Sequence, residues 1–307
     1  MQEKNKRAAV IDLGTNTCLL LVSEFSNNKI STILDVQEVP RLGKGVDKDR
    51  VISDSMFEKI REIFLKYKRL AAENYCDNVF AFGTSALRDA ANKDEFINYI
   101  NSETGIEIDI IEGKKEAKFG FEGALIDFPG KTNQVVIDIG GGSTEVSLLN
   151  NGRLTSLSMN IGSVRLKEKF FSESYSDENL NKAEQFLLNS FVSLAYLNFE
   201  PYSLVGVAGT VTTLSALSQD LKKFESDKVN NSVLRLTDVE RLFCMLVEMK
   251  ESEILKLGEY MIGRNDIITS GAFILLKFMK HFKFEKISVS TKGLRYGAAL
   301  EIFNSLL

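Results

Sequence analysis

The chain has few of the residues on which several common kinds of site depend. It has one histidine, His281, near the end of an amphipathic run from Ile267 to Lys280, and three cysteines, Cys18, Cys76 and Cys244. A lone histidine on such a run is more often structural, so we do not expect a histidine nucleophile or base. Three widely spaced cysteines support neither a disulfide framework nor a zinc site.

Long apolar runs and a large excess of one charge are also lacking. No stretch approaches the roughly 20 apolar residues that a membrane helix needs, and the N-terminus does not resemble a cleavable signal. The 38 basic and 42 acidic residues give a net charge of −4, which argues against a broad nucleic-acid-binding surface. We therefore expect a cytoplasmic protein without membrane or nucleic-acid partners.

Two glycine-rich loops stand out in what the chain does contain. Asp12-Leu-Gly-Thr-Asn-Thr17 follows one apolar run, and Asp138-Ile-Gly-Gly-Gly-Ser-Thr-Glu145 follows another. Such loops let backbone N–H groups point outward together and approach a phosphoryl oxygen closely. A carboxylate at the strand end suits a magnesium ion that bridges phosphate oxygens. Either loop alone is a weak signal, but together they predict a cleft for a phosphate chain.

The length and the order of the predicted elements indicate two domains of similar design. At 307 residues the chain exceeds one ordinary core. The first half predicts strands at 8–13, 17–25, 30–37, 78–83 and 106–112, and helices at 54–74, 93–103 and 114–127. After the linker Phe128-Pro-Gly-Lys-Thr132, the second half predicts strands at 134–139, 144–150, 153–160 and 203–208, and helices from 162 and at 177–199. The repeated order predicts a duplicated α/β fold.

Eight segments in order carry a resemblance to a known family. The chain resembles the exopolyphosphatase and guanosine pentaphosphate phosphatase family, within the actin-like ATPase superfamily. The matching segments are Ile11-Asp-Leu-Gly-Thr-Asn-Thr17, Thr84-Ser-Ala-Leu-Arg-Asp-Ala90, Glu112-Gly-Lys-Lys-Glu-Ala117, Asp138-Ile-Gly-Gly-Gly-Ser-Thr-Glu145, Ile161-Gly-Ser-Val-Arg-Leu166, Gly206-Val-Ala-Gly-Thr210, Gly263-Arg-Asn-Asp-Ile267 and Ser290-Thr-Lys-Gly-Leu-Arg-Tyr-Gly297. The resemblance implies two ribonuclease-H-like domains, 1–128 and 129–297, with an interdomain cleft. It also implies that a helix at about 298–307 packs back on the first domain.

The resemblance also assigns roles to residues. It implies that Glu116 is the base for an attacking water, with Arg88 beside it as a catalytic cation. The metal, Mg²⁺ or Mn²⁺, would be held by Asp12, Asp138 and Glu145. Phosphate would be bound by Gly14, Thr15, Asn16, Gly140, Gly141, Gly142, Ser143, Thr144, Arg165, Gly209 and Thr210. Further candidate cations are Arg264, Lys292 and Arg295, with Arg41 and Lys44 behind them.

The chain departs from the family pattern at two sites. Lys115 stands where an acidic residue commonly precedes the base, and we expect its charge to lower the pKa of Glu116. Asn230 and Asn231 stand where many relatives have histidine and glycine. The chain also ends at Leu307 without the helical C-terminal domains of longer relatives, which leads us to expect a preference for short substrates.

The leading interpretation is a metal-dependent hydrolase that releases the terminal phosphate of inorganic polyphosphate. The closest alternative has the same chemistry on guanosine pentaphosphate, because both substrates present a phosphoanhydride to the same loops. A small-molecule kinase and a non-catalytic sensor of guanosine polyphosphates also remain open. The sensor alternative rests on the changes at Lys115 and at Asn230 and Asn231. Analogy with relatives favours a homodimer.

Overall fold

The protein divides into two compact units, each with one β-sheet. The computed structural model describes residues 6–26, 29–76, 78–128, 133–150, 153–197, 199 and 202–305, and the predicted linker residues 129–132 lie outside these ranges. The first unit runs to Gly123 and resumes at Leu294, and the second is continuous from Ala124 to Gly293. The sequence placed these boundaries at 128/129 and 297/298, a few residues later in both cases.

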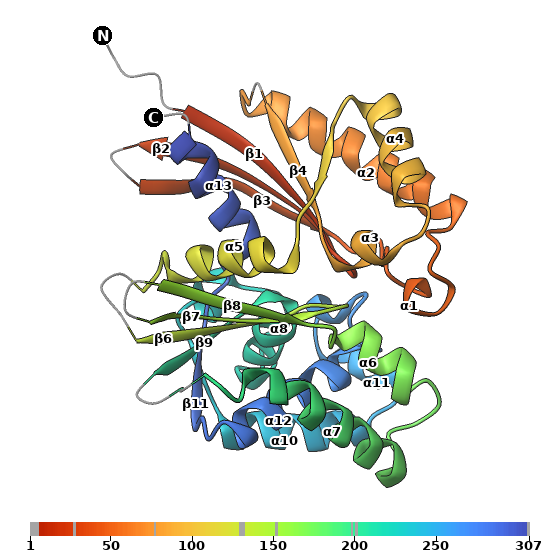
Figure 1. Cartoon of the computed structure of the whole chain (residues 1–307), viewed down its shortest axis with the longest axis vertical. Helices are drawn as coiled ribbons and strands as arrows, with labels where there is room; N and C mark the ends of the chain where they lie inside the picture. The colour runs from red at the N-terminus through yellow and green to blue at the C-terminus, as the bar shows by residue number, and fades with distance from the viewer. Residues whose placement is uncertain are drawn as a thin grey trace. The chain divides into compact units, whose positions relative to one another are not determined.

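The sheet of the first unit combines an antiparallel meander with parallel strands. Its order is β3-β2-β1-β4-β5 (Figure 1), with β1 and β2 antiparallel, β2 and β3 antiparallel, and β1, β4 and β5 parallel. The strands are β1 Lys6–Leu13, β2 Cys18–Ser26, β3 Lys29–Glu38, β4 Val79–Gly83 and β5 Ile108–Ile110. Parallel strands require crossover connections, and helices supply them here.

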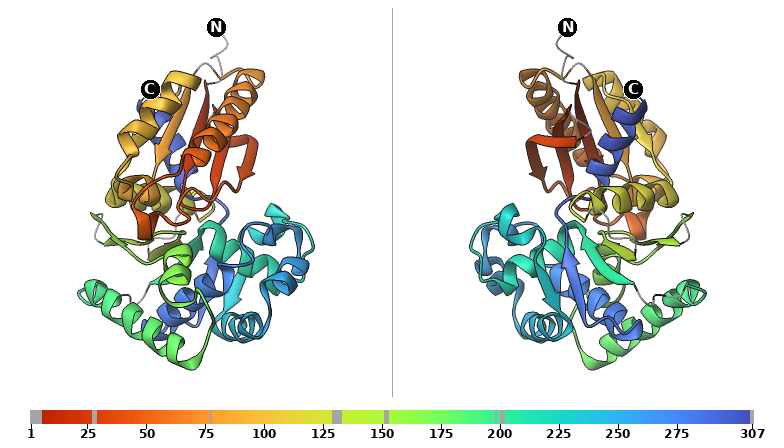
Figure 2. Two further views of the ribbon diagram at one scale, coloured as in Figure 1. Left: turned by 90° about the vertical axis from the view of Figure 1, so that its right-hand side faces the viewer. Right: turned by 90° about the vertical axis from the view of Figure 1, so that its left-hand side faces the viewer.

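Helices cover both faces of this sheet. Ala9, Ile11 and Leu13 point to one face and join the core that α2 completes, and Ala8 and Val10 alternate to the other face. There α13, the last of these helices, lies against β1 and β2 (Figure 2). The ring of Phe303 stacks on that of Phe25, with 5.1 Å between the ring centres. The helices are α1 Val46–Asp49, α2 Asp54–Glu73, α3 Ser85–Asp89, α4 Lys93–Thr104, α5 Gly113–Leu125 and α13 Leu294–Ser305.

The second unit repeats this design. Its sheet has the order β10-β11-β9-β6-β7-β8, in which β6, β7 and β8 form the meander and β6, β9 and β11 run parallel. The strands are β6 Gln134–Ile139, β7 Thr144–Asn150, β8 Arg153–Met159, β9 Ser203–Val207, β10 Val233–Arg235 and β11 Lys286–Val289. The match between β3-β2-β1-β4-β5 and β8-β7-β6-β9-β11 confirms the predicted duplication.

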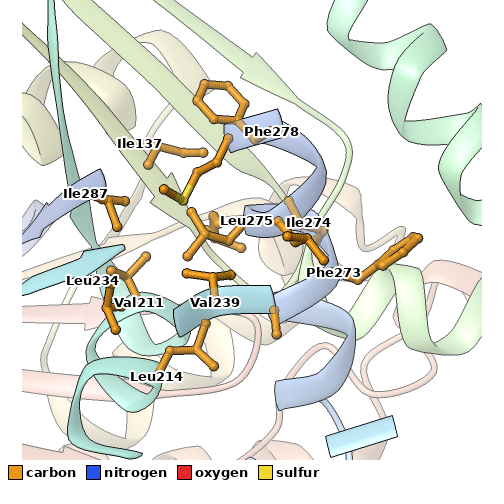
Figure 3. Close-up of a cluster of buried hydrophobic side chains, with 14 of the residues drawn as sticks. Ile137, Val211, Leu214, Leu234, Val239, Phe273, Ile274, Leu275, Phe278 and Ile287 are labelled. Carbon is orange, nitrogen blue, oxygen red and sulfur yellow. The ribbon is translucent and has the colours of Figure 1, made fainter. Parts of the chain in front are cut away.

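The core of the second unit forms around one nearly enclosed helix, α12. In Figure 3, Leu275 and Phe278 of this helix lie on the side of Ile137 of the sheet, and Phe273 points to the opposite side. Side chains from α8, α10 and the neighbouring strands belong to the same cluster. Residues 268–276, 278 and 279 of this helix are buried, so its buried surface extends over more than one face. The helices are α6 Ser163–Phe170, α7 Asp177–Phe191, α8 Ala208–Ser218, α9 Ser226–Val229, α10 Leu236–Glu248, α11 Glu251–Ile254 and α12 Ile268–His281, with 3₁₀ turns at Val192–Leu194, Leu255–Leu257 and Glu259–Met261.

Most of the predicted helices and strands are present, and the differences are few. The helix predicted at 177–199 ends at Phe191 and passes into a 3₁₀ turn, and the short strands β10 and β11 were not predicted. His281 ends α12 with its ring against those of Phe191 and Phe282, which confirms a structural environment. Within the described ranges, no helix is both long enough and apolar enough to cross a membrane.

The close contact of α13 with α5 gives a test of the fold. A Cβ on Gly297 would lie 2.0 Å from the Phe119 carbonyl oxygen, which is backbone and cannot move aside cheaply. We expect Gly297→Ala to lower the free energy of unfolding by about 2–3 kcal/mol in urea titrations, despite the better helix propensity of alanine. Gly293→Ala is the control, because its nearest atom would be Val207 Cβ at 3.8 Å. Equal stability of the two variants would contradict this packing.

Candidate active site

The glycine-rich loop of the second unit is a four-residue hairpin whose carbonyls are all held on one side. Gly140 N–H donates to the Ser143 carbonyl at 3.0 Å and closes the turn. The Gly140 carbonyl accepts from Ser163 N–H at 2.9 Å, and the Gly141 carbonyl accepts from the next two N–H groups of α6. The Gly142 carbonyl accepts from Nε of Arg165 at 2.8 Å. Helix α6 therefore anchors three successive carbonyls.

This anchoring determines where the N–H groups of the loop point. In a trans peptide, the N–H of the following residue points away from the carbonyl. The N–H groups of Gly141, Gly142 and Ser143 therefore point away from α6, which is the arrangement that an anion-binding nest requires. Gly162 permits the close approach, because a Cβ there would lie 2.4 Å from the Gly141 carbonyl oxygen.

The loop of the first unit is built in the same way from a different partner. Gly14 N–H donates to the Thr17 carbonyl at 2.9 Å, and the Thr15 and Asn16 carbonyls accept from the N–H groups of Gly43 and Arg41 at 2.8 and 3.0 Å. The N–H groups of Asn16 and Thr17 consequently point away from the segment 41–43. Arg41 adopts a left-handed backbone, with φ of 67°, to make this contact.

The side chain of Thr144 does not serve the phosphate site in the way that the sequence suggested. Its hydroxyl donates to the Ile161 carbonyl at 2.7 Å, and the residue is fully buried. A threonine hydroxyl has one proton, so this bond uses the only donor that a phosphate could accept from. Thr144 therefore stabilises the approach to α6 instead.

The candidate base lies in the first unit at the start of α5. Glu116 is buried, and its Oε2 accepts a hydrogen bond from Nη1 of Arg88 at 2.6 Å. The same nitrogen donates to the Ile111 carbonyl at 2.7 Å. Burial raises the pKa of Glu116, and the adjacent Arg88 guanidinium opposes this rise. The sequence prediction that the pKa would be lowered is therefore wrong.

Lys115 has little effect on Glu116 because its side chain is turned elsewhere. Its Nζ lies 3.6 Å from an Asp109 carboxylate oxygen and over the rings of Phe82 and Phe119. Successive residues of a helix do not face each other. The positive charge of Lys115 is therefore paired with Asp109, away from Glu116.

Asp12 lies close enough to Glu116 for their charges to interact. Burial, and then the charge of Glu116, raise the pKa of Asp12 to about 7, and Arg295 opposes this rise. Arg295 is itself held by both carboxylate oxygens of Asp35, at 3.1 and 2.7 Å. Burial and the charge of Glu116 disfavour the ionised form of Asp12, and a divalent cation beside it would stabilise that form.

The second unit offers two carboxylates to a cation. Asp138 and Glu145 are direct cross-strand partners on β6 and β7, so their side chains share one face of the sheet. Within the described ranges, no three His, Cys, Asp or Glu side chains are grouped closely enough to hold a metal by themselves. Two carboxylates nevertheless suit Mg²⁺, which keeps several waters and takes further ligands from phosphates. The donor set fits this ion.

A guanidinium lies directly on the glycine at the start of α8. A Cβ on Gly209 would be 1.4 Å from Nη1 of Arg264, so only glycine leaves room for this cation. Burial lowers the pKa of Arg264 to about 10, which still leaves it charged at neutral pH. Thr210 follows, and its side chain fills the space above Gly271. The matching segments around Gly209 and Arg264 thus meet in one place.

Asn230 and Lys292 have structural partners in the second unit. The Asp127 carboxylate accepts from Nδ2 of Asn230 at 2.8 Å and from Nζ of Lys292 at 2.6 Å. Oδ1 of Asn230 accepts from Thr291 N–H at 2.9 Å. Asn231 has φ of 62°, the conformation for which glycine is usual. The Asn-Asn pair therefore ties together three segments that are distant in sequence.

Comparisons with known proteins agree with this architecture. The model of the Ppx/GppA phosphatase family matches residues 21–306. The chain belongs to this family. Its members are phosphoanhydride hydrolases, and the match confirms the resemblance inferred from the eight segments.

Individual members cover nearly the whole chain. A bifunctional 3-dehydroquinate synthase/phosphatase of Fusobacterium nucleatum is 34% identical over 97% of this chain. The match covers 47% of that longer protein. Exopolyphosphatase 2 of Mycobacterium tuberculosis is 28% identical over 96% of this chain and 98% of its own length. The crystal structure of an exopolyphosphatase from Cytophaga hutchinsonii superposes with a TM-score of 0.90, at 27% identity over 98% of both chains. The two-domain actin-like fold is thereby confirmed.

The raised pKa of Asp12 predicts a pH-dependent effect on stability. A carboxyl whose pKa is raised by folding stabilises the protein fully below its unfolded pKa, and this contribution is lost as the pH rises through about 7. Without metal, we expect Asp12→Asn to become more stable relative to wild type by about 1–2 kcal/mol between pH 5 and pH 8. Partial solvent contact makes this smaller than the full change in pKa implies. Urea unfolding with a chelator at both pH values measures it, and a difference independent of pH would contradict it.

The contacts of Glu116 predict which neighbouring residue changes its pKa. Arg88 lowers the pKa of Glu116 and Lys115 does not contribute. We expect Arg88→Gln to shift the acidic limb of the phosphate-release rate to higher pH, because the base loses its stabilising cation. Lys115→Gln is the matched control and should leave the limb in place. A shift caused by Lys115→Gln would show that the ion pair with Asp109 does not divert its charge.

Proposed function

We propose that this protein is a metal-dependent exopolyphosphatase that hydrolyses the terminal phosphoanhydride of inorganic polyphosphate and releases orthophosphate. The observation that carries the proposal is the buried Glu116 carboxylate, hydrogen-bonded to Arg88 at 2.6 Å. Its raised pKa makes it a stronger base than an ordinary glutamate. Water is a poor nucleophile, and this group is suited to accept its proton.

In the proposed reaction, water attacks the terminal phosphorus and transfers a proton to Glu116. The bond from that phosphorus to the bridging oxygen breaks, and the shortened chain leaves. The N–H groups of Gly141, Gly142 and Ser143, and those of Asn16 and Thr17, bind phosphoryl oxygens. Arg165 and Arg264 add positive charge beside the loop and beside Gly209. Phosphoryl transfer depends mainly on such positioning and charge neutralisation.

A divalent cation, when bound, would neutralise phosphate oxygens and draw the chain into place. Asp138 and Glu145 are the residues that would hold it, and Asp12 is the further carboxylate that we predicted from the sequence. Magnesium is the expected ion, and manganese could replace it because both favour oxygen ligands.

Guanosine pentaphosphate remains the closest alternative substrate, because it offers the same phosphoanhydride to the same groups. The reasons for expecting a non-catalytic sensor are weakened by the contacts of two residues. Lys115 pairs with Asp109, and Asn230 bonds to Asp127 and Thr291, so both residues have a structural role in their own unit. Preference for short substrates, a cytoplasmic location and a homodimer stay predictions.

Phosphate release from medium-length polyphosphate, guanosine pentaphosphate and ATP, with Mg²⁺ and with chelator, tests the proposal. We expect release mainly from polyphosphate, only with metal, and a loss of at least about 100-fold in kcat for Glu116→Gln. Glu112→Gln, an exposed glutamate one helical turn earlier, is the control and should change kcat less than twofold.

Each alternative predicts a different result in the same assay. Preference for the nucleotide would favour the pentaphosphate reading, and transfer from ATP to an acceptor would favour a kinase. Polyphosphate binding without any release would contradict the enzyme proposal and support a sensor. Equal turnover of short and long polyphosphate would remove the expected length preference.

A further inference from the structure

A row of three polar residues crosses the meander of the second unit. Asp138 on β6 pairs with Glu145 on β7, and Glu145 pairs with Ser158 on β8. Residues directly opposite each other in a sheet present their side chains on the same face. Ser158 therefore extends the row begun by the two carboxylates, although it lies in none of the eight matching segments.

The contact between the last two members is short. The Ser158 hydroxyl donates to Oε1 of Glu145 at 2.6 Å. This length is typical of a hydroxyl that donates to an ionised carboxylate, which is stronger than a bond between neutral groups. Glu145 is 2% exposed, whereas Ser158 is open to solvent. The bond thus holds one oxygen, Oε1, of a buried carboxylate.

The first unit shows that the hairpin does not need this arrangement to fold. Its counterpart row is Asp12 on β1, Leu19 on β2 and Gln37 on β3. The middle position is apolar there, so that row has no carboxylate at the position of Glu145. The combination of a carboxylate with a hydroxyl donor is therefore particular to the unit in which we place two metal ligands.

We propose that Ser158 is a positioning residue that orients the Glu145 carboxylate for binding a divalent cation. This inference rests on the proposed function, because it assumes that Glu145 is a metal ligand. Hydrogen bonds to the ligands of a metal hold them in their binding orientation, and removing one typically weakens metal affinity by 10- to 100-fold. Ser158 would touch neither the substrate nor the metal.

The same two strands provide a matched control. Ser156 lies two residues earlier on the same face of β8, and its hydroxyl bonds to Ser147 at 2.9 Å. Removing this hydroxyl also takes one side-chain hydrogen bond from the same strand pair, without touching a carboxylate. Ser158→Thr is a second control, because threonine keeps the donor.

The experiment measures Mn²⁺ binding to the enzyme without substrate, by the electron paramagnetic resonance signal of free Mn²⁺. The metal concentration for half-maximal phosphate release is measured in parallel. We expect Ser158→Ala to weaken both about tenfold, with kcat largely restored at saturating metal. Ser158→Thr and Ser156→Ala should stay within about twofold of wild type. Glu145→Gln should lose metal binding.

The outcomes separate this inference from the proposed function. Binding by Ser158→Ala within twofold of wild type, while Glu145→Gln loses it, would overturn the role of Ser158 alone. An equal loss in Ser156→Ala would also overturn it, because the effect would then come from the strand pair. Metal binding that is unchanged in Glu145→Gln, or absent from wild type, would overturn the metal role of Glu145 as well.

Discussion

Each glycine-rich loop depends on one constraint, which is that its carbonyls are held by neighbouring backbone or side-chain donors. In the second unit the anchor is the start of α6, and in the first unit it is the segment 41–43. Because a trans peptide directs its N–H opposite to its carbonyl, anchoring one side orients the other. Folding already orients these N–H groups, and it supplies the free energy that is needed to bring their dipoles together. An anion that binds to such a loop would therefore require little reorganisation of the backbone.

The two units share this loop but carry different side chains around it. The first unit carries the buried Glu116 with Arg88, while the second carries the carboxylate row that begins at Asp138 and the guanidinium on Gly209. Duplication supplied the frame twice, and different side chains then occupied equivalent strand positions. Leu19 and Glu145 show this most simply, since each is the middle residue of its row.

Features that depend on a local sequence pattern could be predicted from the sequence. Features that depend on contacts between distant residues could not. The strands flanking both loops follow from short apolar runs, and Glu116 and Arg88 follow from family segments. The direction of the Glu116 pKa shift did not follow, because it depends on burial and on where Lys115 turns. The contact of Ser158 with Glu145 could be found only from the strand register. Thr144 was misassigned because its partner, the Ile161 carbonyl, is 17 residues away.

The placement of α13 has a consequence for how the chain acquires its structure. The strands that it covers, β1 and β2, are the first of the described elements along the chain, and α13 is the last of them. The second unit is continuous and can form from consecutive residues, but the face of the first sheet that carries Ala8 and Val10 waits for a partner nearly 290 residues later. Such a non-local contact is slow to form, and the apolar surface left open in the meantime is prone to aggregation. A chain stopped before Leu294 would keep both glycine-rich loops but leave that surface bare.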